Sequence, residues 1–121
     1  MENINNFLYP LHKQSTVKDA YSNATPLKQN LSREIDTIRN CVAMLVDRAV
    51  LTIQKDIGKI YIEQYEDGST AVKAYGEFTF DQAVELYTLI KFVTKNMDSE
   101  PSILELVPIE DTQFYAVRLK L

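Results

Sequence analysis

A sustained apolar spacing between residues 26 and 57 is the feature that most constrains how this chain folds. Its six positions are separated by steps of four and three residues: Leu31, Ile35, Ile38, Val42, Leu45 and Ala49. Residues at these steps share one side of an α-helix. Thr25-Pro26 suits a helix start, with Asn30 or Ser32 as later alternatives, and Gly58 suits a stop. The sequence therefore predicts a long helix over residues 26–57.

The second half of this predicted helix is apolar on most sides. From Cys41 to Ile53, only Asp47, Arg48 and Thr52 are not apolar, and such a helix needs cover on most sides. An alternative is two strands joined at Asp47-Arg48, although this pair makes a poor two-residue hairpin turn. The first half has a narrower stripe with polar flanks, which suits a partner helix. We therefore expect the six stripe residues to form an interface between chains, and the protein to be a homo-oligomer, a dimer or higher.

Residues 59–80 carry the clearest hairpin pattern, with two alternating strands around Glu66-Asp67-Gly68. A two-residue loop would mix apolar and polar residues on both faces. A three-residue loop that ends on a left-handed Gly68 pairs Tyr65 with Ser69 and separates the two kinds of residue, so we predict this register. One face then carries Ile60, Ile62, Val72, Ala74, Gly76, Phe78 and Phe80, and the other carries Tyr61, Glu63, Tyr65, Lys73, Tyr75 and Glu77.

A second helix and a second hairpin complete the predicted fold. Asp81 caps this helix, which runs to about Met97, and Asn96 or Asp98 ends it. Its expected buried stripe is Ala83, Leu86, Tyr87, Ile90, Val93 and Met97. The hairpin joins residues 102–107 to 113–121, and its inner face is Leu104, Leu106, Tyr115, Val117, Leu119 and Leu121. The order α-β-β-α-β-β predicts an α+β fold, with a four-stranded, mainly antiparallel sheet and both helices on one face.

The length of 121 residues fits one domain. Residues 1–24 are polar apart from the segment 7–11, so we interpret them as an N-terminal arm and residues 25–121 as a single α+β domain. We expect the apolar segment to dock on its own domain or on a neighbouring chain. An arm exchanged between subunits is one way to order it.

Composition limits the compartment and the partners. The longest apolar run has six residues, Cys41–Val46, too few to span a bilayer, and the first residues lack the features of a secretory signal. A single cysteine excludes an internal disulfide and fits a reducing cytosol. The net charge is −4, with +2 on residues 1–59 and −6 on residues 60–121, which disfavours nucleic acid as the partner. We therefore predict a cytoplasmic protein that does not contact membranes.

Residues that carry chemistry are few and scattered. His12 is the only histidine and lies in the arm, while Cys41 lies in the apolar helix, where a thiol is usually inert. One histidine and one cysteine fit no zinc spacing. Asp67 fits a turn better than a calcium loop, and the three glycines are isolated. We predict no catalytic residue, metal or cofactor, and a protein that is not an enzyme.

The outer face of the predicted sheet offers the best binding surface. Tyrosines and cations alternate there, together with residues of the last hairpin: Tyr61, Tyr65, Lys73, Tyr75, Phe114, Arg118 and Lys120. Such a face suits stacking on a ring, pairing with a phosphate, a protein interface or simple cross-strand stabilisation. The sequence favours a non-enzymatic protein-interaction module, such as an inhibitor, adaptor or regulatory subunit. The alternative is an oligomeric binder of a small anionic or nucleotide-like ligand held between subunits.

Overall fold

The computed structural model describes residues 14–19, 31–52 and 59–121, and for residues 14–19 it describes the backbone only. In chain order the elements are β1 Gln14–Asp19, α2 Ser32–Asp47, β2 Ile60–Tyr65, β3 Thr70–Phe78, α3 Phe80–Asn96, β4 Ile103–Pro108 and β5 Tyr115–Lys120. Every strand pair is antiparallel, and the order across the sheet is β1-β2-β3-β5-β4. The predicted α+β fold class is confirmed, and the four strands expected from the sequence are present.

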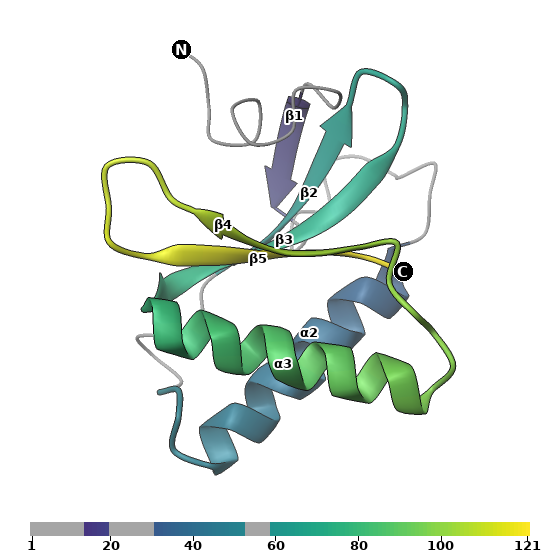
Figure 1. The fold of residues 1–121 in the computed structure, drawn as a ribbon. Coiled ribbons are helices and arrows are strands. Elements are labelled where there is room, and N and C mark those ends of the chain that lie inside the picture. Colours follow the sequence, from purple (N-terminus) through teal and green to yellow (C-terminus); the bar gives the residue numbers. More distant parts are fainter. Residues whose placement is uncertain (1–13, 20–30, 53–58) are drawn as a thin grey trace.

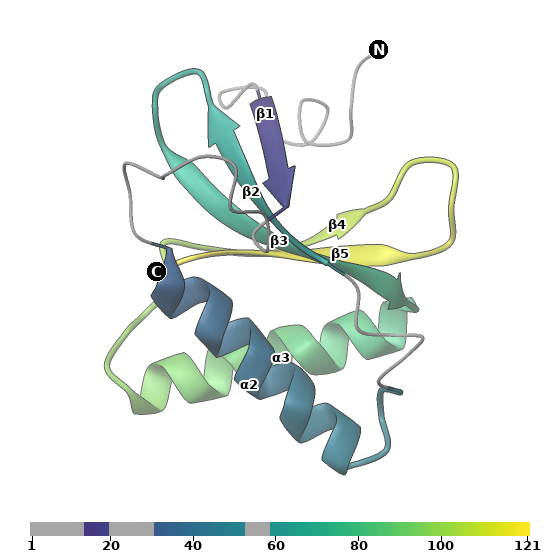
Figure 2. The same cartoon turned by 180° about the vertical axis from the view of Figure 1, so that it is seen from behind.

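Both helices lie on the same side of the sheet (Figure 1), and the view from behind in Figure 2 shows α2 crossing α3 beneath it. The β2–β3 hairpin rises away from the helices, whereas β4 and β5 remain above α3, so the sheet is strongly bent. The core fills the space between the two layers. Its most buried apolar side chains include Leu31, Ile38, Leu45, Val72, Phe78, Leu86, Ile90, Val117 and Leu119.

The β2–β3 hairpin has the predicted register. The Tyr65 N–H donates to the Ser69 carbonyl at 3.0 Å, the Gly68 N–H donates to the Tyr65 carbonyl at 3.0 Å, and Gly68 has φ +86°. Ile60 lies opposite Ala74 as a result. The three-residue loop that separates the two faces is therefore confirmed. The placement of Phe80 on the apolar face was wrong, because Phe80 begins α3 and is 52% exposed. The last hairpin is confirmed as well, because its predicted inner-face residues all belong to the core or pack against it.

Helix α3 matches its predicted position, and it ends at Asn96, one of the two predicted end residues. It starts earlier than expected, because Thr79 forms a capping box with Gln82. The Gln82 N–H donates to Thr79 Oγ1 at 3.2 Å, and the Thr79 N–H donates to Gln82 Oε1 at 2.9 Å. Asp81 is therefore a first-turn residue and not the cap. Met97 was predicted to be buried and is 57% exposed, because the helix ends at Asn96.

The prediction of a helix that continues to Ile57 was wrong, as was the alternative of two strands. Helix α2 ends at Asp47, and Ala49 takes a left-handed conformation with φ +61°. The Val50 N–H then donates to the Leu45 carbonyl and the Ala49 N–H to the Val46 carbonyl, both at 2.9 Å, which is a Schellman-type helix end. The chain turns back here, and Leu51 is buried in the core. The predicted end signals Thr25-Pro26 and Gly58 lie outside the described residues, whereas Ser32, a later alternative for the start, is the first residue of α2.

The predicted contact between chains through the heptad-like stripe was also wrong. Leu31, Ile38, Val42 and Leu45 are buried in the core of their own chain, and Ile35 packs against that core. Ala49 lies beyond the helix and is exposed. The four buried residues face α3 and the sheet of the same chain, so they are not available to hold a second copy. Whether the protein forms an oligomer stays a prediction.

Part of the predicted arm belongs to the sheet. Strand β1 pairs antiparallel with β2 along Gln14–Asp19, with a register irregularity between Gln14 and Thr16. The described sheet thus has five strands, one more than predicted. The apolar segment 7–11 and His12 lie outside the described residues, and so do the expectations attached to them.

Candidate functional site

The central strands bring an unusual group of charged residues to the sheet face opposite the helices. Lys73 on β3 lies directly across from Tyr61 on β2 and from Arg118 on β5. Arg118 in turn lies across from Glu105 on β4. Glu63 is two residues from Tyr61 on β2, so the alternation of the strand places it on the same face. We call Glu63, Lys73, Arg118 and Glu105 the ion cluster.

Three members of the ion cluster are almost completely buried. Glu63 is 0% exposed, and Lys73 and Arg118 are each 1% exposed. Arg118 holds the Glu63 carboxylate with two nitrogens, Nε to Oε1 at 2.7 Å and Nη2 to Oε2 at 3.2 Å. Lys73 Nζ lies 3.0 Å from Glu63 Oε2. A third arginine nitrogen, Nη1, is 3.5 Å from Oε2 of the partly exposed Glu105. One buried carboxylate therefore holds two buried cations.

Tyrosines surround the ion cluster. The Tyr65 hydroxyl donates to Glu63 Oε1 at 3.2 Å. Lys73 Nζ donates to the Tyr75 hydroxyl at 3.2 Å and lies 5.3 Å from the centre of the same ring. The rings of Tyr61 and Tyr75 meet edge to face at 4.9 Å. These contacts supply the polar partners and the packing that buried charges require.

Burial shifts the protonation equilibria of this face. It lowers the pKa of Lys73 from its usual 10.5 to about 8, because loss of hydration outweighs the attraction of Glu63. It raises the pKa of Tyr75 to about 12, with the negative charge of Glu63 acting in the same direction. The pKa of Tyr65 is raised for the same two reasons. The shift of Lys73 brings the pKa of this buried ammonium toward neutral pH.

Two of the three predicted surface cations, Lys73 and Arg118, are not presented to a ligand on this face. Lys73, Arg118 and Tyr65 are buried, and both cations contact carboxylates of their own chain. Four predicted surface residues are half-buried instead: Tyr61, Tyr75, Phe114 and Lys120. The sequence placed Glu63, Lys73 and Arg118 on one face correctly. It could not show that β5 lies next to β3, which is what brings Arg118 to Glu63.

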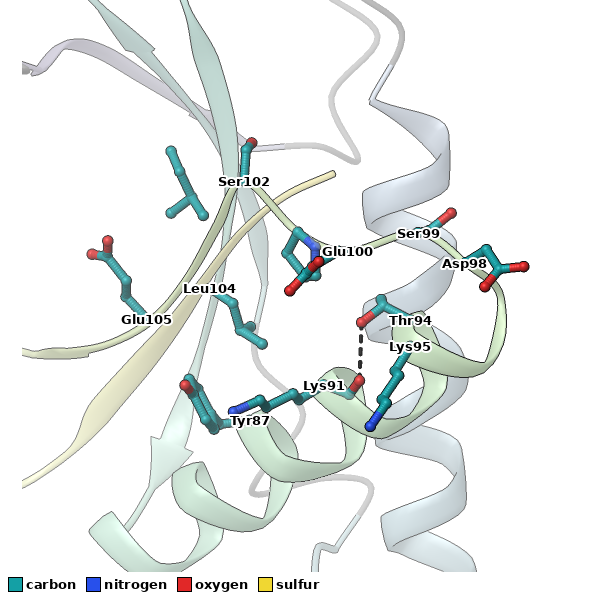
Figure 3. Close-up of a pocket in the computed structure, with 12 residues that line it drawn as sticks. Tyr87, Lys91, Thr94, Lys95, Asp98, Ser99, Glu100, Ser102, Leu104 and Glu105 are labelled. Carbon is teal, nitrogen blue, oxygen red and sulfur yellow. Dashed lines mark hydrogen bonds between the residues drawn. The ribbon is translucent and has the colours of Figure 1, made fainter.

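A groove of about 700 Å³ lies between α3 and β4 and was not found by sequence reasoning (Figure 3). We call it the α3–β4 groove. Its helix side includes Tyr87, Lys91 and Lys95, and its strand side includes Leu104. In Figure 3 Leu104 points toward α3, whereas Glu105 points away from the helix. The groove depends on the position of β4 against α3, for which a single sequence carries no signal.

Strand β4 forms an edge of the sheet beside this groove. The Ile109 N–H donates to the Phe114 carbonyl at 3.0 Å, which together with the register directs the backbone groups of odd-numbered residues toward β5. The N–H and C=O groups of Leu104 and Leu106 therefore point to the outer edge. No hydrogen bond from residues 14–19, 31–52 or 59–121 reaches them there. Such an edge can accept another strand.

Other kinds of site find little support in the described part of the chain. It holds no group of three or more His, Cys, Asp and Glu side chains arranged for a metal ion. Cys41 is buried in the core, and burial raises the pKa of its thiol to about 11, which disfavours the nucleophilic thiolate. None of the described helices has the length and apolar character needed to cross a bilayer.

Comparison of this chain with protein-family models, with curated proteins and with solved structures gave no match. Inferences about function therefore rest on the geometry of the β4 edge, the α3–β4 groove and the ion cluster.

Proposed function

We propose that this protein is a non-enzymatic protein-interaction module that binds an extended segment of a partner chain along β4. The segment adds a strand to the sheet and lies over the α3–β4 groove. An inhibitor, an adaptor or a regulatory subunit can use such a site. The single observation that carries the proposal is the outward direction of the Leu104 and Leu106 backbone groups beside a groove of about 700 Å³.

The physical basis is strand addition. Backbone hydrogen bonds to an open edge supply affinity, and side chains that alternate between the two faces supply specificity. On the helix side the groove provides Leu104 and the half-buried Tyr87, so part of the segment leaves water on binding. The other edge of the described sheet is β1. Edge β4 differs because a helix wall stands next to it (Figure 3).

The alternative function, binding of a small anionic ligand on the outer sheet face, is less well supported. That proposal needs positive charge directed at the ligand. Lys73 and Arg118 are instead buried with Glu63, and Arg118 also contacts Glu105. An anion at this place would compete with a carboxylate that both cations already contact.

A pair of substitutions at Leu106 tests the proposed function. Leu106→Pro removes the outward N–H and places a ring at the edge, whereas Leu106→Ala shortens the side chain and keeps the N–H. Peptides of ten residues selected from a random display library should bind the Ala variant at least about tenfold more tightly than the Pro variant. Binding is measured by fluorescence anisotropy, and circular dichroism checks that both variants fold.

Backbone amide signals give a second readout of the same experiment. Bound peptide should shift the NMR signals of Leu104 and Leu106 and slow their hydrogen exchange. Selection that enriches no peptide, or equal affinity of the Pro and Ala variants for the selected peptides, would contradict the proposal.

A further inference from the structure

The two sides of the β4 edge place different charged side chains next to a bound strand, Lys91 on the helix side and Glu105 on the other. This inference rests on the proposed strand addition and concerns the chemistry of the segment that binds. A strand beside β4 places the residue opposite Leu104 on the helix side of the sheet and the residue opposite Glu105 on the other side. Neighbouring residues of the partner therefore meet different surroundings, whichever direction the partner strand runs.

The helix side places two lysines at the groove. Lys91 and Lys95 project from α3 and are exposed, and Asp98 and Glu100 line the same groove from the end of α3 and the connector to β4. Neither lysine forms an ion pair within residues 31–52 and 59–121. Figure 3 shows Lys91 with Tyr87 on the side of α3 that faces Leu104. An acidic side chain opposite Leu104 would meet this lysine at the mouth of the groove.

The opposite side is acidic and incompletely compensated. Glu105 is 34% exposed at its side chain, and its contact with Arg118 is long, at 3.5 Å. Arg118 directs its two closer contacts to Glu63, at 2.7 and 3.2 Å. Burial raises the pKa of Glu105 despite the nearby arginine, so the carboxylate lacks full stabilisation. A second cation next to Glu105 would supply the missing stabilisation of the carboxylate.

We propose that the partner is an extended segment with an acidic residue next to a basic one. The acidic side chain lies over the α3–β4 groove near Lys91, and the basic side chain lies on the opposite face beside Glu105. Both pairs form together only when the two residues are neighbours in an extended strand, because such neighbours point to opposite faces.

A second copy of this chain fits the β4 edge less well than such a segment. Strand β4 has the sequence Ile-Leu-Glu-Leu-Val-Pro, which holds no lysine or arginine. Two β4 strands paired about Glu105 would place two carboxylates opposite each other, which is destabilising. The other registers give Glu105 an apolar neighbour. No register of β4 on β4 gives Glu105 a cation.

Three capped peptides test the inference on the full chain. All have eight residues in which Val and Thr flank a central pair, and the pair is Glu-Lys, Gln-Gln or Lys-Lys. We expect the Glu-Lys peptide to bind about five- to tenfold more tightly than the Gln-Gln peptide at low salt, and this advantage to shrink in 0.5 M salt. Titration followed by NMR measures the weak affinities.

Charge variants assign the two contacts. Lys91→Glu should reverse the preference, so that the Lys-Lys peptide binds more tightly than the Glu-Lys peptide. Glu105→Gln should reduce the advantage of Glu-Lys over Gln-Gln by about half on the logarithmic scale. Glu85→Gln is the matched control, because Glu85 is exposed on α3 and does not line the groove. It should leave the ranking of the three peptides unchanged.

The possible outcomes separate this inference from the proposed function. Equal binding of all three peptides, abolished when alternate backbone nitrogens are methylated, would overturn the charge pairing and leave strand addition intact. No binding at millimolar peptide, or binding that methylation does not affect, would overturn strand addition itself. A dimer that Leu106→Pro dissociates and Leu106→Ala does not, seen by sedimentation, would identify a second copy as the occupant and overturn the inference.

Discussion

Arg118 and Leu119 are neighbours in β5 and both are almost fully buried, yet they lie on opposite faces of the sheet. Leu119 faces the helices and belongs to the apolar core with Val72. Arg118 faces the other way and holds Glu63 with two hydrogen bonds. The comparison shows that equal burial rests on different interactions on the two faces. Apolar packing is non-directional and depends on volume, whereas an ion cluster depends on each of its members.

This difference has an energetic consequence. The transfer of charges from water costs several kcal/mol for each ion, which their mutual attraction offsets only when every partner is in place. The Glu63 carboxylate is shared by two cations, so its loss affects more contacts than the loss of either cation. On the helix side, the loss of one side chain leaves a cavity whose cost depends on its size. Four experiments test the comparison.

The largest effect is expected for Glu63→Gln, which keeps the size of the side chain and removes its charge. Lys73 and Arg118 then lose the buried carboxylate that both contact. The free energy of unfolding, measured in urea, should fall by about 3–5 kcal/mol. Glu105→Gln is the control. Its partly exposed carboxylate is 3.5 Å from Arg118, so a loss below about 1 kcal/mol is expected. If both variants lose the same free energy of unfolding, the burial of a carboxylate does not determine how much it contributes to stability.

Leu119→Ala tests the helix side of the sheet. This side chain is fully buried against the helix layer, so truncation should lower the free energy of unfolding by about 2–4 kcal/mol. Leu119→Met keeps most of the volume and should cost less than about 1.5 kcal/mol. The same urea series measures both. A Met variant as unstable as the Ala variant would show that shape, and not volume, governs this face.

A smaller effect is expected from pH and depends on Lys73. Burial lowers the pKa of this ammonium to about 8 in the folded chain, against 10.5 when exposed. Between pH 8 and pH 10.5 the Lys73 amine binds more protons in the unfolded state than in the folded state. The free energy of unfolding therefore rises with pH in this window. Below pH 8 the ammonium is charged in both states, so the full cost of burying its charge is present. Relative to Lys73→Met, the wild type should gain roughly 2 kcal/mol between pH 8 and pH 10.5.

The comparison with the variant removes contributions from other groups. Burial raises the pKa of Tyr75 to about 12 and that of Cys41 to about 11, and both groups lower stability as pH rises above their usual values. The contribution of Cys41 is common to the wild type and to Lys73→Met, and that of Tyr75, which contacts Lys73, acts mainly above pH 10. Parallel curves of unfolding free energy against pH would contradict the assignment of the titration to Lys73.

The smallest change is expected when the buried charges are replaced together. The triple variant Glu63→Leu, Lys73→Met and Arg118→Met removes the desolvation cost along with the attraction. Its free energy of unfolding should lie within about 1 kcal/mol of the wild type, or above it. A loss of more than about 3 kcal/mol would mean that the ion cluster contributes net stability. The ion cluster and the apolar core would then both add net stability, and the two faces of the sheet would differ less.

Local patterns predicted much of this fold because they act over a few residues. The Asp67-Gly68 turn and the alternation of β2 and β3 determine the register, since a shift of one residue would reverse the two faces. The same alternation placed Glu63, Lys73 and Arg118 on one side. The end of α2 was missed because Ala49 is not a residue that marks a left-handed helix end, and the apolar pattern continues past it. Its conformation is held by Val50 and Leu51, which pack into or against the core.

By itself, the sequence determined β2 to β5 and the body of α3, how the β2–β3 hairpin pairs and which side chains of these strands share a face. Only the tertiary structure decided the strand order, and with it the neighbours of Arg118 and the position of β4 at an edge. It also turned the stripe of α2 inward, where the sheet and α3 of the same chain cover it. The physical reason is the separation along the sequence over which each interaction acts. Turn geometry and alternation are set by neighbours in sequence, whereas burial depends on which distant segments meet.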